Sequence, residues 1–360
     1  RLKRIYAFIG CKYCFYSPLA SGERRFFMKK FRILSVILAV LTAFAAGFGC
    51  KVTDNKGDNG ETGRTALQFY CPDGAPALAA AGLFGNETLG TDDITMNYHV
   101  ISADKIASTV LKTTKKADVA ILPVNAAAKI CGTGEDYVLT SVLTHGNLFI
   151  VSDTEITIND LVGKVVGVIG RGLVPDMTLK AVLTKNNVEY VEANTAESGK
   201  VALTYYESGE ELMPAMKQNK IKIGLLPEPA ATKIVTKLKT AYTYRLDLGE
   251  LYDGGYPQAV MLVKKSVMEA HPDFYGKLTA ALQASVTWVN TVENASAAVD
   301  AVNAKLDEGV VGTLDTFVTA EVIGRCSVKY ASASSMKTKI KGYLSAIGQN
   351  LPSDAFFYGE

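Results

Sequence analysis

The sequence predicts an α/β protein built from two units, each with a sheet covered by helices. From Thr65 onward, short runs of strand-forming residues alternate with helical stretches, a pattern typical of parallel strands joined by helices. The pattern restarts at Val165. The chain has 360 residues, whereas a typical domain has about 150. We therefore expect two α/β units, followed by a helical C-terminal segment that packs on one of them.

The first unit begins with a strand at 67–70 that runs into the turn Pro72–Ala75. A helix rich in Ala and Leu follows this turn. Asn125 is positioned to cap a later helix that ends at Ile130. The expected strands are 67–70, 94–100, 118–122, 137–143 and 148–151, and the expected helices are 76–84, 103–111, 125–130 and 157–161.

The second unit opens with the strand Val165–Ile169, followed by the tight loop Gly170-Arg171-Gly172. Pro175 and Asp176 open the next helix, because Pro is favoured at the first helical positions. Ser208 and Glu211 have the spacing of a capping box. The expected strands are 165–169, 201–205, 221–225 and 258–263; the expected helices are 175–185, one opening at Ser208, and then helices for the rest of the chain, including 273–292.

The distribution of charge argues against a nucleic-acid-binding protein. The whole chain has a net charge of +2, but residues 1–50 hold nine Lys and Arg and a single acidic residue, which leaves residues 51–360 at −6. Recognition of a phosphate backbone usually rests on a basic surface. The mildly acidic body therefore gives no electrostatic reason to expect nucleic acid as a partner.

Residues 28–49 have the pattern of a secretory signal peptide. A basic stretch, Met28–Arg32, precedes seventeen uncharged residues, Ile33–Gly49, and then Cys50. The residues Ala46–Cys50 resemble the lipobox of bacterial lipoproteins, whose Cys is lipidated, although Gly47 departs from the usual Leu. The resemblance implies lipidation at Cys50 and anchoring to the bacterial membrane outside the cytoplasm. An uncleaved membrane-spanning helix and plain secretion are the alternatives.

On either side of this leader, two segments are expected to lie outside the fold. Residues 50–63 have few apolar side chains to offset their ordering entropy, so we expect a flexible tether. Residues 1–27 precede Met28 and have no sustained periodicity, so we expect a non-native N-terminal extension. Its Cys11 and Cys14 have no second pair or strand-helix context that would indicate a metal or redox site.

Three cysteines remain in the body of the chain, and we expect them to fill small apolar sites. They are Cys71, Cys131 and Cys326. One disulfide among them is possible, and its pairing is left open.

Ligand-binding residues are expected in loops that follow strands and precede helices. In open α/β sheets, ligands lie beyond the carboxyl ends of the strands, where helix N-termini offer free N–H groups and partial positive charge. These features suit a carboxylate, sulfonate, nitrate or phosphate. The loops that meet the condition are 71–76, 123–125, 144–147, 170–176 and 227–229.

Single residues in these loops have both a functional and a structural interpretation. The guanidinium of Arg171, between two glycines, is suited to a paired contact with an oxyanion, or is an exposed loop arginine. His145 lies at a strand end, where it either touches a ligand or has a structural role. Asp73 and Gly74 are also ordinary turn formers.

Catalytic and metal-binding motifs are missing from the sequence. The three histidines are not spaced as metal ligands, no His-Glu-x-x-His or Gly-x-Ser-x-Gly occurs, and the glycines of 167–172 do not have the dinucleotide-binding spacing. We therefore expect no catalytic residues, no metal and no cofactor.

Several stretches together resemble the substrate-binding proteins of nitrate/sulfonate/taurine-type ABC importers. They are Asp160–Thr178, Gly224–Ala231, Tyr256–Gln258 and Pro72–Leu78, and the likeness runs from about Leu67 to Tyr358. The resemblance implies the type 2 periplasmic-binding-protein fold, with two lobes joined by two crossovers. Lobe 1 is expected at 64–147 plus 257–360, and lobe 2 at 148–256.

The resemblance also implies the site and its partners. A small solute, anionic or heteroaromatic, is expected to bind between the lobes and to be delivered to the importer's permease subunits by a monomeric receptor. The insertion 188–200 and the variable Arg171 loop leave the solute class open. The implied contacts are Asp73, Gly74, Ala75 and Asn125 of lobe 1 and Gly170, Arg171, Pro175, Asp176 and Glu228 of lobe 2, to which His145 is added from its position.

Two other functions stay open at this point. The resemblance also reaches enzymes of the same fold, the pyrimidine-precursor synthases and menaquinone-pathway enzymes, which act in the cytoplasm, whereas residues 28–50 predict export. A surface or adhesive protein without a small ligand is the third possibility.

Overall fold

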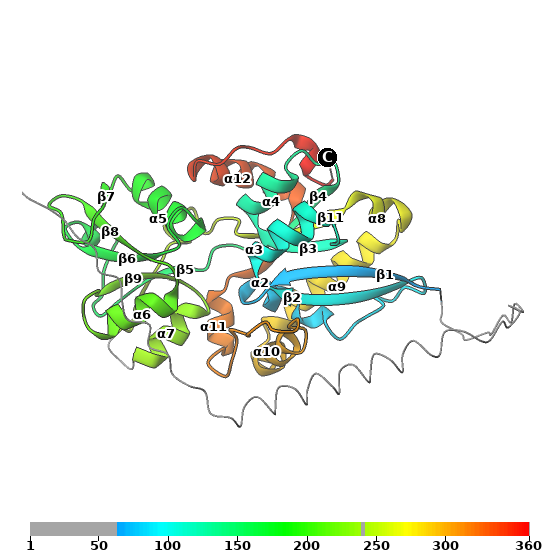
Figure 1. Ribbon diagram of the computed structural model, residues 1–360, viewed down its shortest axis with the longest axis horizontal. Helices are drawn as coiled ribbons and strands as arrows, with labels where there is room; N and C mark the ends of the chain where they lie inside the picture. Colours follow the sequence, from blue (N-terminus) through cyan, green and yellow to red (C-terminus); the bar gives the residue numbers. More distant parts are fainter. Residues whose placement is uncertain (1–62, 239–241, 360) are drawn as a thin grey trace, which may run out of the picture. The chain divides into compact units, whose positions relative to one another are not determined.

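The structure is a computed structural model, and it describes residues 63–238 and 242–359 (Figure 1). The expectations for residues 1–27, for 28–49, for lipidation at Cys50 and for nearly all of the tether fall outside the described residues. Within them, no helix is long and apolar enough to cross a membrane.

The described residues form two six-stranded sheets, each belonging to one lobe. The strands of lobe 1 come from both ends of the chain, and those of lobe 2 from its middle (Figure 1). Sheet 1 has the order β12-β4-β11-β3-β1-β2, and sheet 2 the order β10-β5-β9-β6-β8-β7. The strands of sheet 1 are β1 (Thr65–Pro72), β2 (Ile94–Ile101), β3 (Val119–Pro123), β4 (Tyr137–Thr144), β11 (Ala259–Lys264) and β12 (Val328–Ser332). Those of sheet 2 are β5 (Leu148–Ser152), β6 (Val165–Ile169), β7 (Tyr190–Glu192), β8 (Val201–Tyr206), β9 (Ile223–Pro227) and β10 (Tyr244–Asp247).

All nine strands expected from the sequence are confirmed, but the sheets are mixed rather than parallel. In sheet 1, β11 runs antiparallel to both β3 and β4. In sheet 2, β5 runs antiparallel to β9 and β10. The two crossovers explain the antiparallel pairs. Parallel neighbours need a helix between them that carries the chain back to the start of the sheet, whereas β4 leads into β5, and β10 into β11, without a helix.

The expectation that only helices follow residue 263 is wrong at one place. β12 pairs antiparallel with β4 at the edge of sheet 1. Its sequence, Val-Lys-Tyr-Ala-Ser, is short and its residues are mostly half-buried, so it lacks the continuous apolar run of a central strand. The strands β7 and β10 are edge strands of the same kind.

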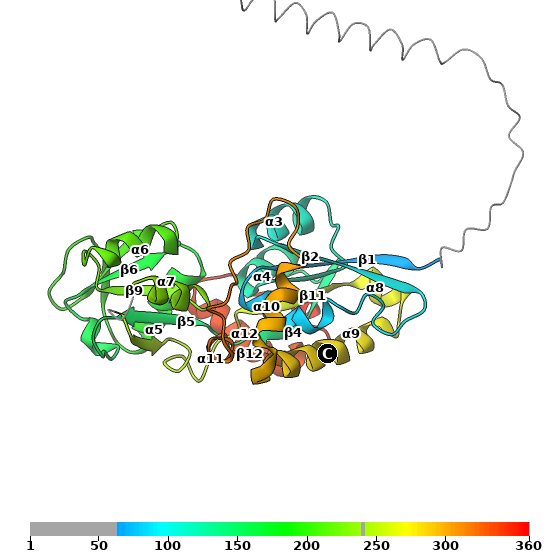
Figure 2. The ribbon, with the colours of Figure 1, turned by 90° about the horizontal axis from the view of Figure 1, so that it is seen from below.

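The helices cover both faces of each sheet (Figures 1 and 2). One apolar core lies between sheet 1 and helices α2, α9 and α10, another between sheet 2 and α6 and α7, and a third includes residues of α4, α5, α12 and both sheets. The bounds are α2 (Ala75–Ala80), α3 (Ala103–Lys105), α4 (Val124–Cys131), α5 (Val174–Lys185), α6 (Gly209–Lys217), α7 (Ala230–Leu238), α8 (Lys265–Ala270), α9 (Phe274–Val289), α10 (Ala295–Asn303), α11 (Ala320–Arg325) and α12 (Ala333–Ala346). The chain also has a π-helix, η2 (Ile106–Thr113), and four short 3-10 turns, η1 (Ala81–Leu83), η3 (Asn159–Leu161), η4 (Val292–Asn294) and η5 (Asp354–Phe356), among the described residues.

The two expected helix caps have different outcomes. Ser208 accepts a hydrogen bond from the Glu211 N–H at 3.3 Å and thereby caps α6, as expected. The prediction for Asn125 is wrong, because α4 already begins at Val124 and Pro123 occupies the cap position.

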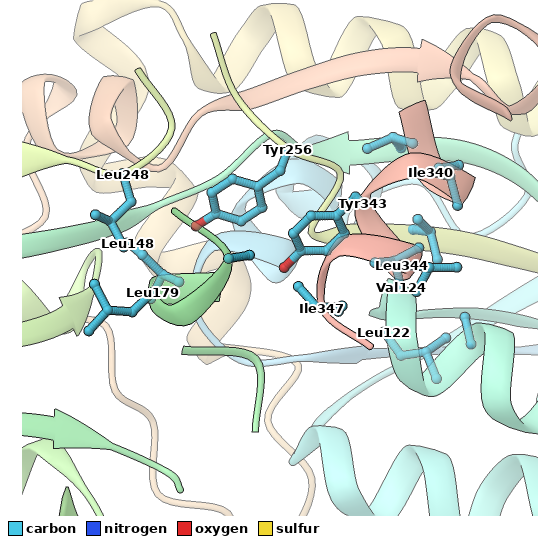
Figure 3. Close-up of a cluster of buried hydrophobic side chains, with 14 of the residues drawn as sticks. Leu122, Val124, Leu148, Leu179, Leu248, Tyr256, Ile340, Tyr343, Leu344 and Ile347 are labelled. Carbon is cyan, nitrogen blue, oxygen red and sulfur yellow. The ribbon is translucent and has the colours of Figure 1, made fainter. Parts of the chain in front are cut away.

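Near the crossovers, two stacked tyrosines lie in a cluster of buried hydrophobic side chains that joins the lobes (Figure 3). Tyr256, in the second crossover, stacks on Tyr343 of α12, with ring centroids 5.1 Å apart. The Tyr343 hydroxyl lies 2.7 Å from Thr178 Oγ1 of α5, so α12 bonds directly to lobe 2. Gly146, in the first crossover, has φ +94°, and a Cβ there would lie 2.8 Å from the Tyr256 ring. The close approach of the two crossovers therefore requires glycine at this position.

Candidate functional site

A cavity of about 300 Å³ lies where the strand ends of the two lobes meet. Its walls come from the turn between β1 and α2 and from Thr313 of lobe 1, from Asn147 in the first crossover, and from the turn between β9 and α7 and the start of α6 of lobe 2. The lining residues are Asp73, Gly74, Ala75, Pro76, Asn147, Glu210, Pro227, Glu228, Pro229, Ala230, Lys233 and Thr313. We call this the interlobe cavity.

On the lobe 1 side, Asp73 organises the wall. Its Oδ1 accepts a hydrogen bond from the Gly74 N–H at 2.7 Å, and its Oδ2 accepts one from the Thr313 N–H at 2.6 Å. The carboxylate thus joins two segments 240 residues apart in the chain. Gly74 has φ +96°, a backbone conformation that L-residues rarely adopt. The turn therefore presents the start of α2, with Ala75 and Pro76, to the cavity.

On the lobe 2 side, the carboxylate of Glu228 is fully buried and already bonded within the protein. Its Oε2 accepts from the Thr232 N–H at 3.0 Å, and its Oε1 accepts from Thr232 Oγ1 at 2.8 Å and from Arg325 Nε at 2.8 Å. Arg245 Nε is 3.6 Å from the same Oε1. Because these partners occupy both oxygens, Glu228 shapes the wall and leaves other groups to face a ligand.

Of the four charged lining residues, only Glu228 has an ion pair among the described residues; Asp73, Glu210 and Lys233 have none, and Lys233 is the one cation. Lys233 is half-buried on the first turns of α7, whereas Glu210 is exposed. An ammonium group that has no carboxylate partner is available to bind an anion.

Asn147 is a lining residue that our sequence reasoning did not single out, although it lies in the candidate loop 144–147. Its side chain is buried, and its Nδ2 donates to the Glu228 backbone oxygen at 2.6 Å. This bond fixes the orientation of the amide. Its Oδ1 is buried and has no hydrogen-bond partner in the part of the chain that the structure describes. The only signal in the sequence was its place at a strand end.

The predicted contacts therefore divide into two groups. Asp73, Gly74, Ala75 and Glu228 line the interlobe cavity together. The other predicted contacts lie outside its lining: Asn125, His145, Gly170, Arg171, Pro175 and Asp176. As ligand contacts, the residues of both groups stay predictions.

Arg171 is already engaged within lobe 2. Its guanidinium forms an ion pair with Glu192 and lies over the Tyr205 ring, 5.2 Å from the centroid, while 67% of its side chain is exposed. Asp176 is buried and accepts hydrogen bonds from the Gly172 N–H at 2.8 Å and from Tyr205 OH at 3.1 Å. The 170–176 loop is thus fixed by its own contacts.

Asn125 and His145 also lie away from the interlobe cavity, one at a different cavity and the other against the backbone of Lys329. Asn125 lines a different cavity, of about 560 Å³, between α4 and residues 348–353. His145 Nε2 lies 3.1 Å from the Lys329 backbone oxygen. Burial lowers the pKa of His145 below its usual value, so the ring is neutral near pH 7.

The body cysteines are free and buried, as expected. Burial raises the pKa of the Cys131 thiol to about 12, and the pKa values of Cys71 and Cys326 are also raised by burial. Among residues 63–238 and 242–359, no group of three or more His, Cys, Asp or Glu is placed to hold a metal ion.

Several solved structures of ABC-importer proteins share this fold. The crystal structure of an ABC transporter from Parabacteroides distasonis superposes with TM-score 0.64 at 20% identity, over 82% of this chain and 99% of that chain. The periplasmic aliphatic sulphonate binding protein from Escherichia coli gives TM-score 0.57 at 12% identity, covering 81% and 95%. The ligand-binding component of an ABC-type import system from Staphylococcus aureus, solved with zinc bound, gives 0.54 at 12%, covering 82% and 96%.

The chain therefore has the two-lobed α/β fold of the substrate-binding proteins of ABC importers, which confirms the expected fold class. Neither the family models nor the curated proteins that were searched gave a match.

Proposed function

We propose that this protein captures a small solute in the interlobe cavity, outside the cytoplasm, and delivers it to the permease subunits of an ABC importer. The observation that carries this proposal is a cavity lined by strand ends of both lobes, in a fold shared with importer binding proteins. A solute that contacts both walls binds most tightly when the lobes are close together. Solute binding therefore shifts the protein toward the closed arrangement of the lobes.

The lining supports a solute that is anionic or heteroaromatic. The ammonium of Lys233 has no acidic partner among the described residues, and it lies near the start of α7, where the partial positive charge of the helix also favours an anion. The lining also holds three acidic residues, Asp73, Glu210 and Glu228, and the carboxylates of Asp73 and Glu228 are already hydrogen-bonded within the protein. Its apolar part includes Pro76, Pro227 and Pro229. Flat apolar surfaces of this kind suit the faces of a ring.

The receptor is anchored, in this proposal, by a lipid on Cys50, which follows the apolar stretch 33–49. Two acyl chains on one residue are enough for stable attachment to a membrane. Metabolic labelling with a radioactive fatty acid should label the protein produced from the wild-type sequence and leave the Cys50→Ala variant unlabelled. Equal labelling of both would remove Cys50 as the anchor.

Two measurements test the binding function. Mass spectrometry of the purified protein after denaturation should find a co-purifying small molecule, and calorimetry should then show that the purified compound binds. A panel of alkanesulfonates including MOPS, inorganic anions and nitrogen heterocycles covers the two proposed solute classes. No binding across the panel, together with no co-purifying molecule, would count against the proposal.

A matched pair of variants tests whether binding occurs in the interlobe cavity. Ala230→Trp places an indole in the lining and should abolish binding, because the cavity holds only about 300 Å³. Thr236→Trp, on an exposed position of the same helix and outside the lining, should bind as the wild type does. Equal affinity in both variants would place the solute elsewhere.

A further inference from the structure

We propose that Arg325 is a positioning residue that ties the lobe 2 wall of the interlobe cavity to lobe 1, and that Glu228 exchanges Arg325 for Arg245 when the lobes part. The proposal concerns lobe spacing in the solute-free protein and goes beyond the proposed solute binding.

Arg325 belongs to lobe 1 through its neighbours in the chain. It is the last residue of α11, and β12 of sheet 1 begins three residues later. The segment between them is fixed to lobe 1 and the crossover: the Ser327 backbone oxygen accepts from the His145 N–H at 3.0 Å, and the Val328 oxygen accepts from Asn290 Nδ2 at 3.0 Å. The backbone of Arg325 therefore moves with lobe 1.

The guanidinium of Arg325 nevertheless bonds to lobe 2 at two points. Its Nε donates to Glu228 Oε1 at 2.8 Å, and its Nη2 donates to Thr232 Oγ1 at 2.9 Å. Its side chain is only 20% exposed, and that of Glu228 is 0% exposed. A paired contact between buried charges is stronger and more geometrically specific than one on the surface. The pair therefore fixes where the turn between β9 and α7 lies relative to lobe 1.

Arg245 gives Glu228 a second partner that belongs to lobe 2. It lies on β10 of sheet 2, and its Nε is 3.6 Å from Glu228 Oε1, beyond hydrogen-bond distance. This Nε is buried and has no hydrogen-bond partner among the described residues. Burial lowers the pKa of Arg245, the nearby Arg325 cation lowers it further, and Glu228 opposes both. Two guanidinium groups therefore compete for one carboxylate.

The competition makes the contact reversible. Breaking a buried ion pair without a replacement is strongly unfavourable, because a charge is left unpaired. When the lobes part, Arg325 leaves with lobe 1 while Arg245 stays beside Glu228 on lobe 2, and Thr232 continues to donate to both carboxylate oxygens. Glu228 is then paired in both arrangements, so neither arrangement is prohibited.

Small-angle scattering of the solute-free protein tests this exchange. Arg325→Gln removes the lobe 1 partner and should raise the radius of gyration above that of the wild type. Arg245→Gln removes the partner of the parted arrangement and should leave the radius at or below the wild-type value. Glu321→Gln is the matched control: Glu321 accepts from Arg325 but is 82% exposed and belongs to the same helix, so the radius should not change.

A rise in the radius of gyration in Arg325→Gln without a rise in Arg245→Gln is the signature of partner exchange, because a merely structural role would loosen the protein in both. If Arg325→Gln fails to fold, Thr232→Val, which keeps the shape and removes the Arg325 Nη2 contact together with the hydroxyl bond to Glu228, should give a smaller rise in the radius. Two results would overturn the proposal. One is a folded Arg325→Gln variant whose scattering curve superposes on that of the wild type, and the other is an equal increase in the radius of gyration in Arg245→Gln. Because no solute is present, this outcome is independent of whether the cavity binds one.

Discussion

Removing the hydroxyl of Tyr343 tests whether α12 joins the two lobes. Thr178 Oγ1 lies 2.7 Å from both the Val174 backbone oxygen and the Tyr343 hydroxyl. A threonine hydroxyl has one proton, and the Val174 oxygen can only accept, so Thr178 donates to Val174 and accepts from Tyr343. Tyr343→Phe deletes this donor between the lobes and leaves a buried acceptor unsatisfied.

The free energy of unfolding should fall modestly when the Tyr343 hydroxyl is removed and strongly when the ring is removed. A net hydrogen bond contributes about 1 kcal/mol, so Tyr343→Phe should lower the free energy of unfolding by roughly that amount. The ring is 1% exposed and stacks on Tyr256. Truncating such a buried aromatic side chain costs about 3–5 kcal/mol, which we expect for Tyr343→Ala.

Urea unfolding monitored by circular dichroism measures both losses. Tyr244→Phe is the matched control, because Tyr244 is 42% exposed and exposed substitutions usually change stability by less than about 0.5 kcal/mol. In the Thr178→Val background, Tyr343→Phe should cost clearly less than in the wild type, since the partner is already gone. A Tyr343→Phe variant as stable as Tyr244→Phe would refute the interlobe bond.

Three further predictions follow from single features. Lys233→Gln should weaken binding of an anionic solute about tenfold, as expected from losing one charge-assisted hydrogen bond; unchanged calorimetric affinity would remove Lys233 from the site. Gly146→Ala should lower stability by about 1–3 kcal/mol through strain against Tyr256, while Gly276→Ala, which meets open space, should not; equal melting temperatures would contradict the crowding at the crossovers. Because burial lowers the folded-state pKa of His145, its contribution is fully present above the unfolded value of about 6.5 and is lost as the pH falls below it; a His145→Gln variant that loses as much stability as the wild type between pH 7.5 and 5.5 would disprove this linkage.

The central strands could be predicted from the sequence because both of their faces are buried. Val165–Ile169 is a short run rich in Val and Ile, and residues 259–263 form another short apolar run, as expected of strands buried on both faces. The edge strands β7, β10 and β12 were missed, because a strand with one free edge needs only a few buried positions. Their pairing depends on neighbours far away in the chain.

The candidate site was predicted where a single turn supplies the residues. Asp73, Gly74 and Ala75 are consecutive, so their place at a strand end located them. Thr313 and Arg325 come from segments with no strand-helix signal, and only the fold brings Thr313 to the cavity wall and Arg325 to Glu228. For the same reason the sequence did not show that Arg171 pairs with Glu192, which lies on an edge strand.

The central claim is that a small solute binds between the lobes, and a crystal structure of the protein with its co-purifying solute tests it most directly. We predict density for the solute between the Asp73–Pro76 turn and the first turn of α7, with an acidic or polar group near Lys233. Solute bound at a site with no contact to either wall, such as the groove between α5 and the end of α12, would contradict the account.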